Sequence, residues 1–170
     1  MADSVIELQT SYRFTAQSGI GALSTAIRSG NVKEVKKIIN CFHPDLEIIS
    51  GKTVKQSEML ETLIPSSIRD LNHEMNPAAA FDILESFRVL SPLRLGETGT
   101  LEVNARIKHL LCTDRYQTQE WYPGRPVIIL ENDYAANLYN GDIGIAMIDN
   151  TGQMRVFFKQ EDNSFFSVSI

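Results

Sequence analysis

The chain has 170 residues, of which 43% are hydrophobic and 22% are charged, and its formal net charge is −5. These are ordinary globular values, so they argue against wholesale disorder and allow a packed core. No apolar run approaches the length of a membrane-spanning helix, and the first residues hold neither a basic region nor an apolar signal core, so nothing indicates export.

The negative charge is concentrated late in the sequence. From residue 116 onward there are three basic and seven acidic residues, which gives −4, whereas the first 115 residues carry 13 basic and 14 acidic residues, which gives −1. Non-specific binding to nucleic acid requires Lys and Arg to neutralise phosphates. An acidic chain is therefore a poor free-standing DNA binder, and any contact with DNA should be local and supported by other domains.

The cysteines and histidines predict no metal site. Cys41 and Cys112 form no CxxC pair, and the three histidines have no metal-ligand spacing. We expect buried free thiols in a reducing cytoplasm, and a disulfide between them is the less supported alternative.

Helical patterns fill the first part of the chain. Ser18 can cap a helix with Ile20, Leu23 and Ile27 on one face, and Gly30-Asn31 ends it. Residues 32–39 form a second amphipathic helix, whose predicted inward residues are Val32, Val35, Ile38 and Ile39. Residues 46–49 read as a short strand.

Gly51-Lys52-Thr53 imitates the end of a phosphate-binding loop. The full pattern is G-x-x-x-x-G-K-[ST], and Leu46 stands where its first glycine is needed. Without that glycine the backbone cannot wrap phosphates, so we reject a nucleotide site here.

Further elements alternate up to about residue 115. A helix over 53–64 is ended by Pro65, a second begins at Asn76-Pro77, and a third opens at Thr100. Residues 88–93 read as a strand between the last two. This order predicts an α/β layer.

The composition changes from about Tyr116. The segments 126–130, 142–148, 154–158 and 165–170 alternate as strands, and 149–152 and 161–163 read as hairpin turns. They predict a β-meander of small-barrel size. Asn140-Gly141 marks a sharp reversal, and Gly144 leaves a gap in the next strand that another backbone or a ligand can approach. The chain stops on a strand, which suggests a piece of something longer.

Three segments in register resemble one family, the alpha subunit (RecD) of exodeoxyribonuclease V, a superfamily 1 DNA helicase. Their order and spacing cover nearly the whole chain. They are Ser11-Tyr12-Arg13-Phe14 with Ser18-Gly19-Ile20-Gly21; Val89-Leu90-Ser91-Pro92-Leu93-Arg94 with Gly99 and Asn104; and Trp121-Tyr122-Pro123-Gly124-Arg125-Pro126-Val127 through Asn132-Asp133 to Asn140-Gly141-Asp142-Ile143-Gly144.

The resemblance implies a fragment of the second motor domain. Residues 1–115 would be part of this RecA-like α/β domain, and residues 116–170 a small all-β barrel of the Src-homology type that is inserted into it. The ATP-binding loop and the Mg²⁺-binding acidic motif would lie upstream of Met1, and the remaining helicase motifs downstream of Ile170.

The resemblance also implies a function. The parent subunit would use ATP and Mg²⁺ to move 5′ to 3′ along single-stranded DNA, beside two partner subunits, in double-strand-break repair and recombination in the cytoplasm, with no membrane involved. The fragment alone is expected to bind no cofactor or metal and to hydrolyse nothing.

Arg13 is the one catalytic residue that the resemblance implies. In this family the Tyr-Arg step places an arginine against the γ-phosphate of ATP. A guanidinium suits this role because it is always charged and stabilises spread charge on the transferring phosphoryl group. By residue chemistry alone, Arg13 would read as a surface arginine beside a helix start.

Four residues are candidate DNA contacts: Arg94, Asn104, Arg125 and Asn132. Such groups would bind phosphate or sugar without reading sequence, and an ordinary solvated or capping role stays open for each. Trp121 and Tyr122 can stack on a base or pin the barrel to the α/β layer; we favour packing.

Two other readings compete with the motor fragment. One is a non-catalytic module whose acidic barrel binds a protein partner and whose helicase likeness is vestigial. The other, a self-contained hydrolase, has no nucleophile, base and acid set to support it.

Overall fold

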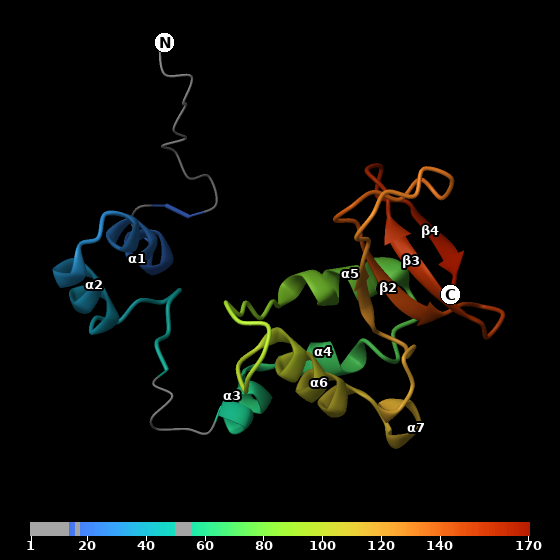
Figure 1. The fold of residues 1–170 in the computed structure, drawn as a ribbon, viewed down its shortest axis with the longest axis horizontal. Coiled ribbons are helices and arrows are strands. Elements are labelled where there is room, and N and C mark those ends of the chain that lie inside the picture. Colours follow the sequence, from blue (N-terminus) through green and yellow to red (C-terminus); the bar gives the residue numbers. More distant parts are fainter. Residues whose placement is uncertain (1–13, 16–17, 50–55) are drawn as a thin grey trace, which may run out of the picture. The chain divides into compact units, whose positions relative to one another are not determined.

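The structure is a computed structural model that describes residues 14–15, 18–49 and 56–170 (Figure 1). It contains two compact units, Met1–Thr53 and Val54–Ile170. The predicted division at residues 115 and 116 stays a prediction. In the described part of the chain, no helix is long and apolar enough to cross a membrane.

The described residues of the first unit form two packed helices, α1 (Gly19–Arg28) and α2 (Val32–Ile39). The predicted Ser18 cap is confirmed, since its Oγ accepts the backbone N–H of Gly21 at 3.0 Å. Gly30 has φ +66° between the helices, a conformation that glycine adopts at low cost. The predicted break at Gly30-Asn31 is thus confirmed.

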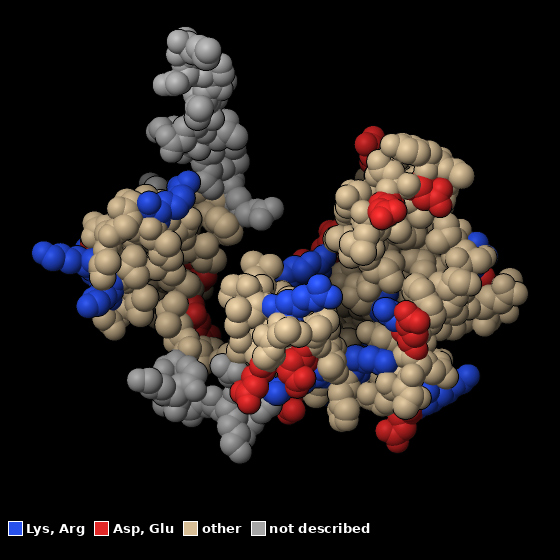
Figure 2. Space-filling view, in the orientation of Figure 1, with Lys and Arg blue, Asp and Glu red and all other residues tan. Residues whose placement is uncertain are grey.

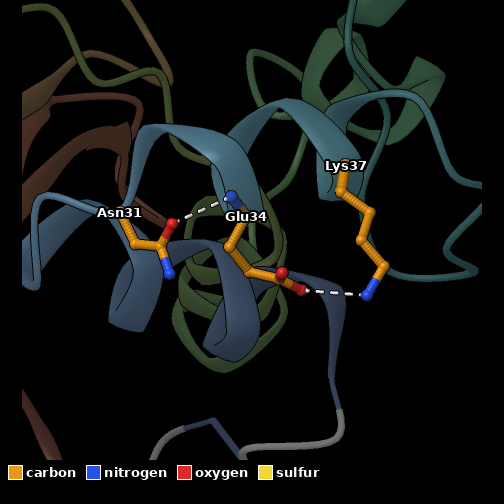
Figure 3. A network of polar contacts seen from close by, with 3 residues as sticks. All are labelled: Asn31, Glu34 and Lys37. Carbon is orange, nitrogen blue, oxygen red and sulfur yellow. Dashed lines mark hydrogen bonds and ion pairs between the residues drawn. The ribbon is translucent and has the colours of Figure 1, made fainter.

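Helix α2 begins at Asn31, whose side-chain oxygen accepts the backbone N–H of Glu34 at 3.1 Å. Figure 3 shows this cap and the ion pair between Glu34 and Lys37, in which Oε1 and Nζ lie 3.3 Å apart. Both charged groups are exposed, so the pair contributes only about 0.3–0.5 kcal/mol. The cap is the stronger determinant of where α2 begins.

Several predictions for the first unit are wrong. Of the predicted inward residues of α2, Val32 and Ile39 are exposed and only Ile38 is fully buried. Two short helices are too small to cover a whole apolar face. Residues 46–49 form no strand; an isolated bridge joins His43 to Leu46 instead. Cys41 and Cys112 are free as expected, but Cys41 is exposed.

The second unit opens with five helices: α3 (Gln56–Leu63), α4 (Ser66–Asp70), α5 (Pro77–Ser86), α6 (Thr100–Leu111) and α7 (Asp114–Gln117). Pro65 separates α3 from α4 as predicted. Asn76 caps α5 by accepting the backbone N–H of Ala78 at 2.9 Å, and Pro77 occupies the first turn, where its missing N–H costs nothing.

The predicted strand at residues 88–93 is wrong, because this segment is irregular. A strand forms only where a second backbone offers hydrogen bonds, and no described segment pairs with this one. Before Pro126, the described residues therefore form helices and one isolated bridge rather than the expected α/β layer.

The predicted β-meander is confirmed. Strands β1 (Pro126–Ile128), β2 (Ile143–Ile148), β3 (Met154–Lys159) and β4 (Phe165–Ser169) form one antiparallel sheet in sequence order, a fold compatible with a small barrel. Gly152 (φ +81°) and Asn163 (φ +64°) lie in the two predicted hairpin turns.

Both faces of the sheet are covered. Ile145 and Met147 face α5, where they join a core with Leu71, Ala80, Phe81 and Leu84; the ring centroids of Phe81 and Phe165 are 5.4 Å apart. Ala146 points to the opposite face, with Leu138, Val156 and Phe158. This alternation follows the two-residue period of a strand. Figure 1 shows α5 lying against the sheet.

The gap expected at Gly144 is filled from within the sheet. Gly144 pairs with Phe158 on β3, and a Cβ added there would lie 2.7 Å from side-chain atoms of Phe158 and Val156. The glycine makes room for these side chains, so the predicted approach of a backbone or ligand is wrong. The reversal at Asn140-Gly141 is confirmed, with Gly141 at φ +97°.

Candidate nucleic-acid interface

Arg13, the predicted catalytic residue, lies outside the described residues, as does Tyr12. The same motif continues into α1, whose first turn the structure describes. There Gly19 and Ile20 donate their backbone N–H groups to Oδ1 and Oδ2 of Asp45, at 2.9 and 3.2 Å. These hydrogen bonds lower the pKa of Asp45 below its ordinary value.

The glycines of this motif are needed for space. A Cβ on Gly19 would lie 2.6 Å from Cβ of His43, and one on Gly21 would collide with the carbonyl oxygen of Thr15. The first backbone N–H groups of α1 already donate to the side chains of Asp45 and Ser18, so the start of this helix is occupied by the chain itself.

A cleft of about 580 Å³ opens in the second unit. It lies against α4, the end of α5, α6 and the segment 120–128 that leads into β1. Two of the four predicted DNA contacts, Asn104 and Arg125, line it together; Arg94 and Asn132 do not. We call it the cationic cleft, because Arg88, Lys108 and Arg125 line it, while Glu120 is the one carboxylate among its described lining residues.

The cations of this cleft are held in place by the protein. The guanidinium of Arg125 lies 5.0 Å from the centroid of the Trp121 ring, donates to the carbonyl oxygen of Glu120, and has Glu120 Oε1 at 3.9 Å. Lys108 lies 5.3 Å from the centroid of Tyr122 and donates to the carbonyl oxygen of Gln119 at 2.7 Å. A positioned cation loses less entropy when it binds a phosphate.

The predicted role of Trp121 and Tyr122 in pinning the barrel to an α/β layer stays a prediction, but the structure shows the contacts of both rings. Trp121 packs against the core cluster behind the sheet, and each ring carries a cation on one face. Burial is the main cause that raises the pKa of Tyr122, so its phenol stays neutral at physiological pH.

Arg94 and Asn132 have other surroundings. Arg94 is exposed in the loop before α6, where its carbonyl oxygen accepts the backbone N–H of Leu101 at 3.3 Å. The side-chain oxygen of Asn132 accepts the backbone N–H of Asn140 at 2.8 Å, and its amide nitrogen donates to the hydroxyl of Tyr134 at 3.0 Å. These contacts brace the loop between β1 and β2.

Sequence reasoning missed Arg88 and Lys108. Both stand outside the quoted motifs: Arg88 is the first residue of the irregular segment 88–93, and Lys108 lies on α6. Lys108 follows Asn104 by four residues on α6, and residues with this spacing lie on the same face of a helix. This spacing was the signal in the sequence that could have identified Lys108. The approach of the segment 120–128 to α6 is a tertiary contact.

No family model matches the chain, but curated relatives do. They include the RecBCD enzyme subunit RecD of Buchnera aphidicola subsp. Acyrthosiphon pisum (30% identical, 100% of this chain and 30% of the relative), of Mycobacterium tuberculosis (31%, 87% and 26%) and of Haemophilus influenzae (30%, 85% and 26%). The chain thus spans less than a third of the length of these relatives.

All three relatives are subunits of one named enzyme, so the chain is related to the subunits of a multi-subunit assembly. In particular, it is similar along nearly its whole length to a segment of RecD, and the resemblance carried by its three motifs is confirmed.

Proposed function

We propose that the chain works as part of the helicase subunit of an ATP-dependent exodeoxyribonuclease, in DNA double-strand-break repair and recombination in the cytoplasm. The carrying observation is that 85 to 100% of the chain matches RecD subunits. The whole subunit would use ATP and Mg²⁺ to move 5′ to 3′ on single-stranded DNA, beside two partner subunits.

We assign residues 1–115 to the RecA-like second motor domain and residues 116–170 to an inserted barrel of the Src-homology type. The support is the element order, helices followed by a four-stranded antiparallel meander. The chain alone is proposed to bind no cofactor and hydrolyse no ATP, because its sequence holds no complete G-x-x-x-x-G-K-[ST] pattern.

Arg13 is proposed to stabilise the γ-phosphate of ATP held by the other motor domain. Its support is the Tyr-Arg motif, which leads into the side-chain-capped start of α1. In the parent subunit, Arg13→Ala should leave ATP binding largely intact and lower turnover by about 10³–10⁵-fold, as the loss of an arginine finger does.

This test needs the whole subunit and a readout that separates binding from chemistry. Nucleotide binding is followed with a fluorescent ATP analogue, and turnover with a DNA-stimulated ATPase assay. Arg28→Ala, in the last turn of α1, is the matched control and should keep full turnover. Unchanged turnover in Arg13→Ala would remove this residue from the mechanism, while absence of any DNA-stimulated ATPase in the wild type would reject the motor itself.

The cationic cleft is proposed as a place where the subunit touches the phosphates of single-stranded DNA. Asn104 and Arg125 line it as predicted candidates, and Arg88 and Lys108 add positive charge. Contacts of this kind position a strand without reading its sequence. Arg94 and Asn132 remain separate candidates whose surroundings carry less support, since Asn132 already uses its side-chain amide within the loop.

The alternative, a non-catalytic module with a vestigial helicase likeness, is not favoured. Its support was the acidic C-terminal part and the missing motifs, and the relatives that match nearly the whole chain are enzyme subunits.

A further inference from the structure

One surface of the second unit has a chemistry that DNA binding leaves unexplained. Strands β1 and β2 are joined by residues 129–142, and β3 and β4 by residues 160–164; because the sheet is an antiparallel meander, both connections lie at the same end of it. We call these two connections the acidic tip. They hold Glu131, Asp133, Asp142, Glu161 and Asp162, and no Lys or Arg, although Lys159, the last residue of β3, adjoins them.

The tip exposes large apolar groups. Leu130 is 75% exposed, Tyr134 is 76% exposed and Tyr139 is 47% exposed. The two tyrosine rings meet edge to face, with centroids 6.2 Å apart. Tyrosine is one of the residue types that provide most of the binding energy in protein interfaces.

These side chains sit on a loop that is already ordered. Asp133 and Leu138 exchange backbone hydrogen bonds at 2.8 and 2.9 Å, and the Tyr139 hydroxyl donates to Asn137 Oδ1 at 3.1 Å. Leu138 is buried in the cluster on the face of the sheet opposite α5, with Ala146, Val156 and Phe158. A surface that is fixed before binding loses little conformational entropy when a partner arrives.

Charge selects the kind of partner. The five carboxylates of the two connections repel the phosphates of DNA and attract Lys and Arg. Figure 2 shows acidic residues, and no basic ones among them, over this end of the sheet on the face that is drawn. Arginine and lysine side chains also stack favourably on tyrosine rings.

We propose that the acidic tip is a docking surface for a Lys/Arg-rich segment of another protein. The tyrosine pair and Leu130 supply the contact area, and the surrounding carboxylates supply selectivity and fast association. This site is separate from the cationic cleft, and it holds whether or not the chain serves a helicase.

The test measures binding of the chain to a fluorescein-labelled peptide of alternating Arg and Leu, by anisotropy at physiological ionic strength. A peptide with Glu in place of Arg and a labelled oligo-dT of similar length are the comparison probes. We expect the Arg/Leu peptide to bind, and the other two to bind at least tenfold more weakly. Tighter binding of oligo-dT at the tip would overturn the proposal in favour of nucleic acid.

Variants separate a docking surface from general attraction to an acidic protein. Tyr134→Ala with Tyr139→Ala keeps every charge and should weaken binding of the Arg/Leu peptide by about tenfold or more. Glu161→Gln with Asp162→Asn should weaken it and flatten its salt dependence. Glu85→Gln with Glu97→Gln, exposed and away from the tip, removes the same charge and should leave binding unchanged.

Folding of each variant is checked by its circular dichroism and melting temperature, and unfolded variants are replaced by Tyr134→Ser alone. Equal binding by the tyrosine variant and the wild type, or equal weakening by the Glu85/Glu97 control, would overturn the proposal.

Discussion

The cationic cleft and the acidic tip belong to the same unit, yet they have opposite charge. Three cations line the cleft beside one carboxylate, whereas the tip carries five carboxylates and no cation. The net charge of −5 describes neither surface. At physiological ionic strength the interaction between exposed charges is screened beyond about 8 Å. The partner of a surface is therefore inferred from the charges on that surface and not from the net charge of the chain.

The cleft and the tip are both supported by the packing of α5 against the sheet, and disrupting this packing should have the largest effect on stability. Phe81 on α5 packs against Phe165, the first residue of β4 after the tip, while its neighbour Leu84 lines the cleft. Phe81→Ala should lower the free energy of unfolding by about 3–5 kcal/mol. Urea denaturation measures it, with Leu90→Ala, 91% exposed, as the control. A loss below about 1 kcal/mol would show that α5 does not support the sheet.

Removing a positive charge from the cationic cleft should have a smaller effect, on DNA binding, than the loss of α5 packing has on stability. In the parent subunit, Lys108→Gln and Arg125→Gln should each weaken oligo-dT binding and reduce the slope of log affinity against log salt by about 0.7 per lost phosphate contact. Anisotropy titrations at several salt concentrations measure the slope.

The tip supplies the matched control for the cleft. Glu161→Gln changes one charge there and should not reduce that salt slope. If the cleft variants keep the wild-type slope, the cleft does not contact phosphate; if Glu161→Gln lowers it, the two surfaces do not differ as described.

The smallest expected effect concerns an acidic residue that serves folding. Asp149, in the β2–β3 turn at the end of the sheet opposite the tip, accepts the hydroxyl of Thr151 at 2.6 Å and the backbone N–H of Gln153 at 2.9 Å. The hydrogen bond from Thr151 is the main cause that lowers its pKa. Because its pKa is lower in the folded state, the Asp149 carboxylate stabilises the fold when the pH is above its unfolded pKa of about 3.9. This stabilisation is lost as the pH falls through the pKa of the folded state.

The melting temperature should therefore fall on acidification from pH 5 to pH 3, and it should fall less in Asp149→Asn than in the wild type. Glu161→Gln is the control, because within the described part of the chain the Glu161 carboxyl makes no hydrogen bond or ion pair, and this variant should keep the wild-type fall in melting temperature. An identical fall in Asp149→Asn and the wild type would show that this carboxylate does not contribute.

Local chemistry in the sequence predicted most element boundaries. Ser18, Gly30, Pro65 and Asn76-Pro77 act within one turn of themselves, and alternation with turn residues predicted the four strands. The prediction of a strand at 88–93 was wrong because a strand needs hydrogen bonds to a second backbone, and the alternation of residues within one segment does not show whether such a partner is present. Gly144 was misread for a similar reason, as the space above it is filled by Phe158 from the next strand.

By itself, the sequence determined the caps, the meander and the family resemblance, because each rests on neighbouring residues or on motifs in register. Tertiary structure alone decided which charges share a surface. It gathered Asn104, Lys108 and Arg125 around one cleft, left Arg94 and Asn132 outside it, and brought the two acidic connections of the tip to one end of the sheet. Electrostatic and packing energies depend on distance in space, and residues far apart in sequence meet only when the chain folds.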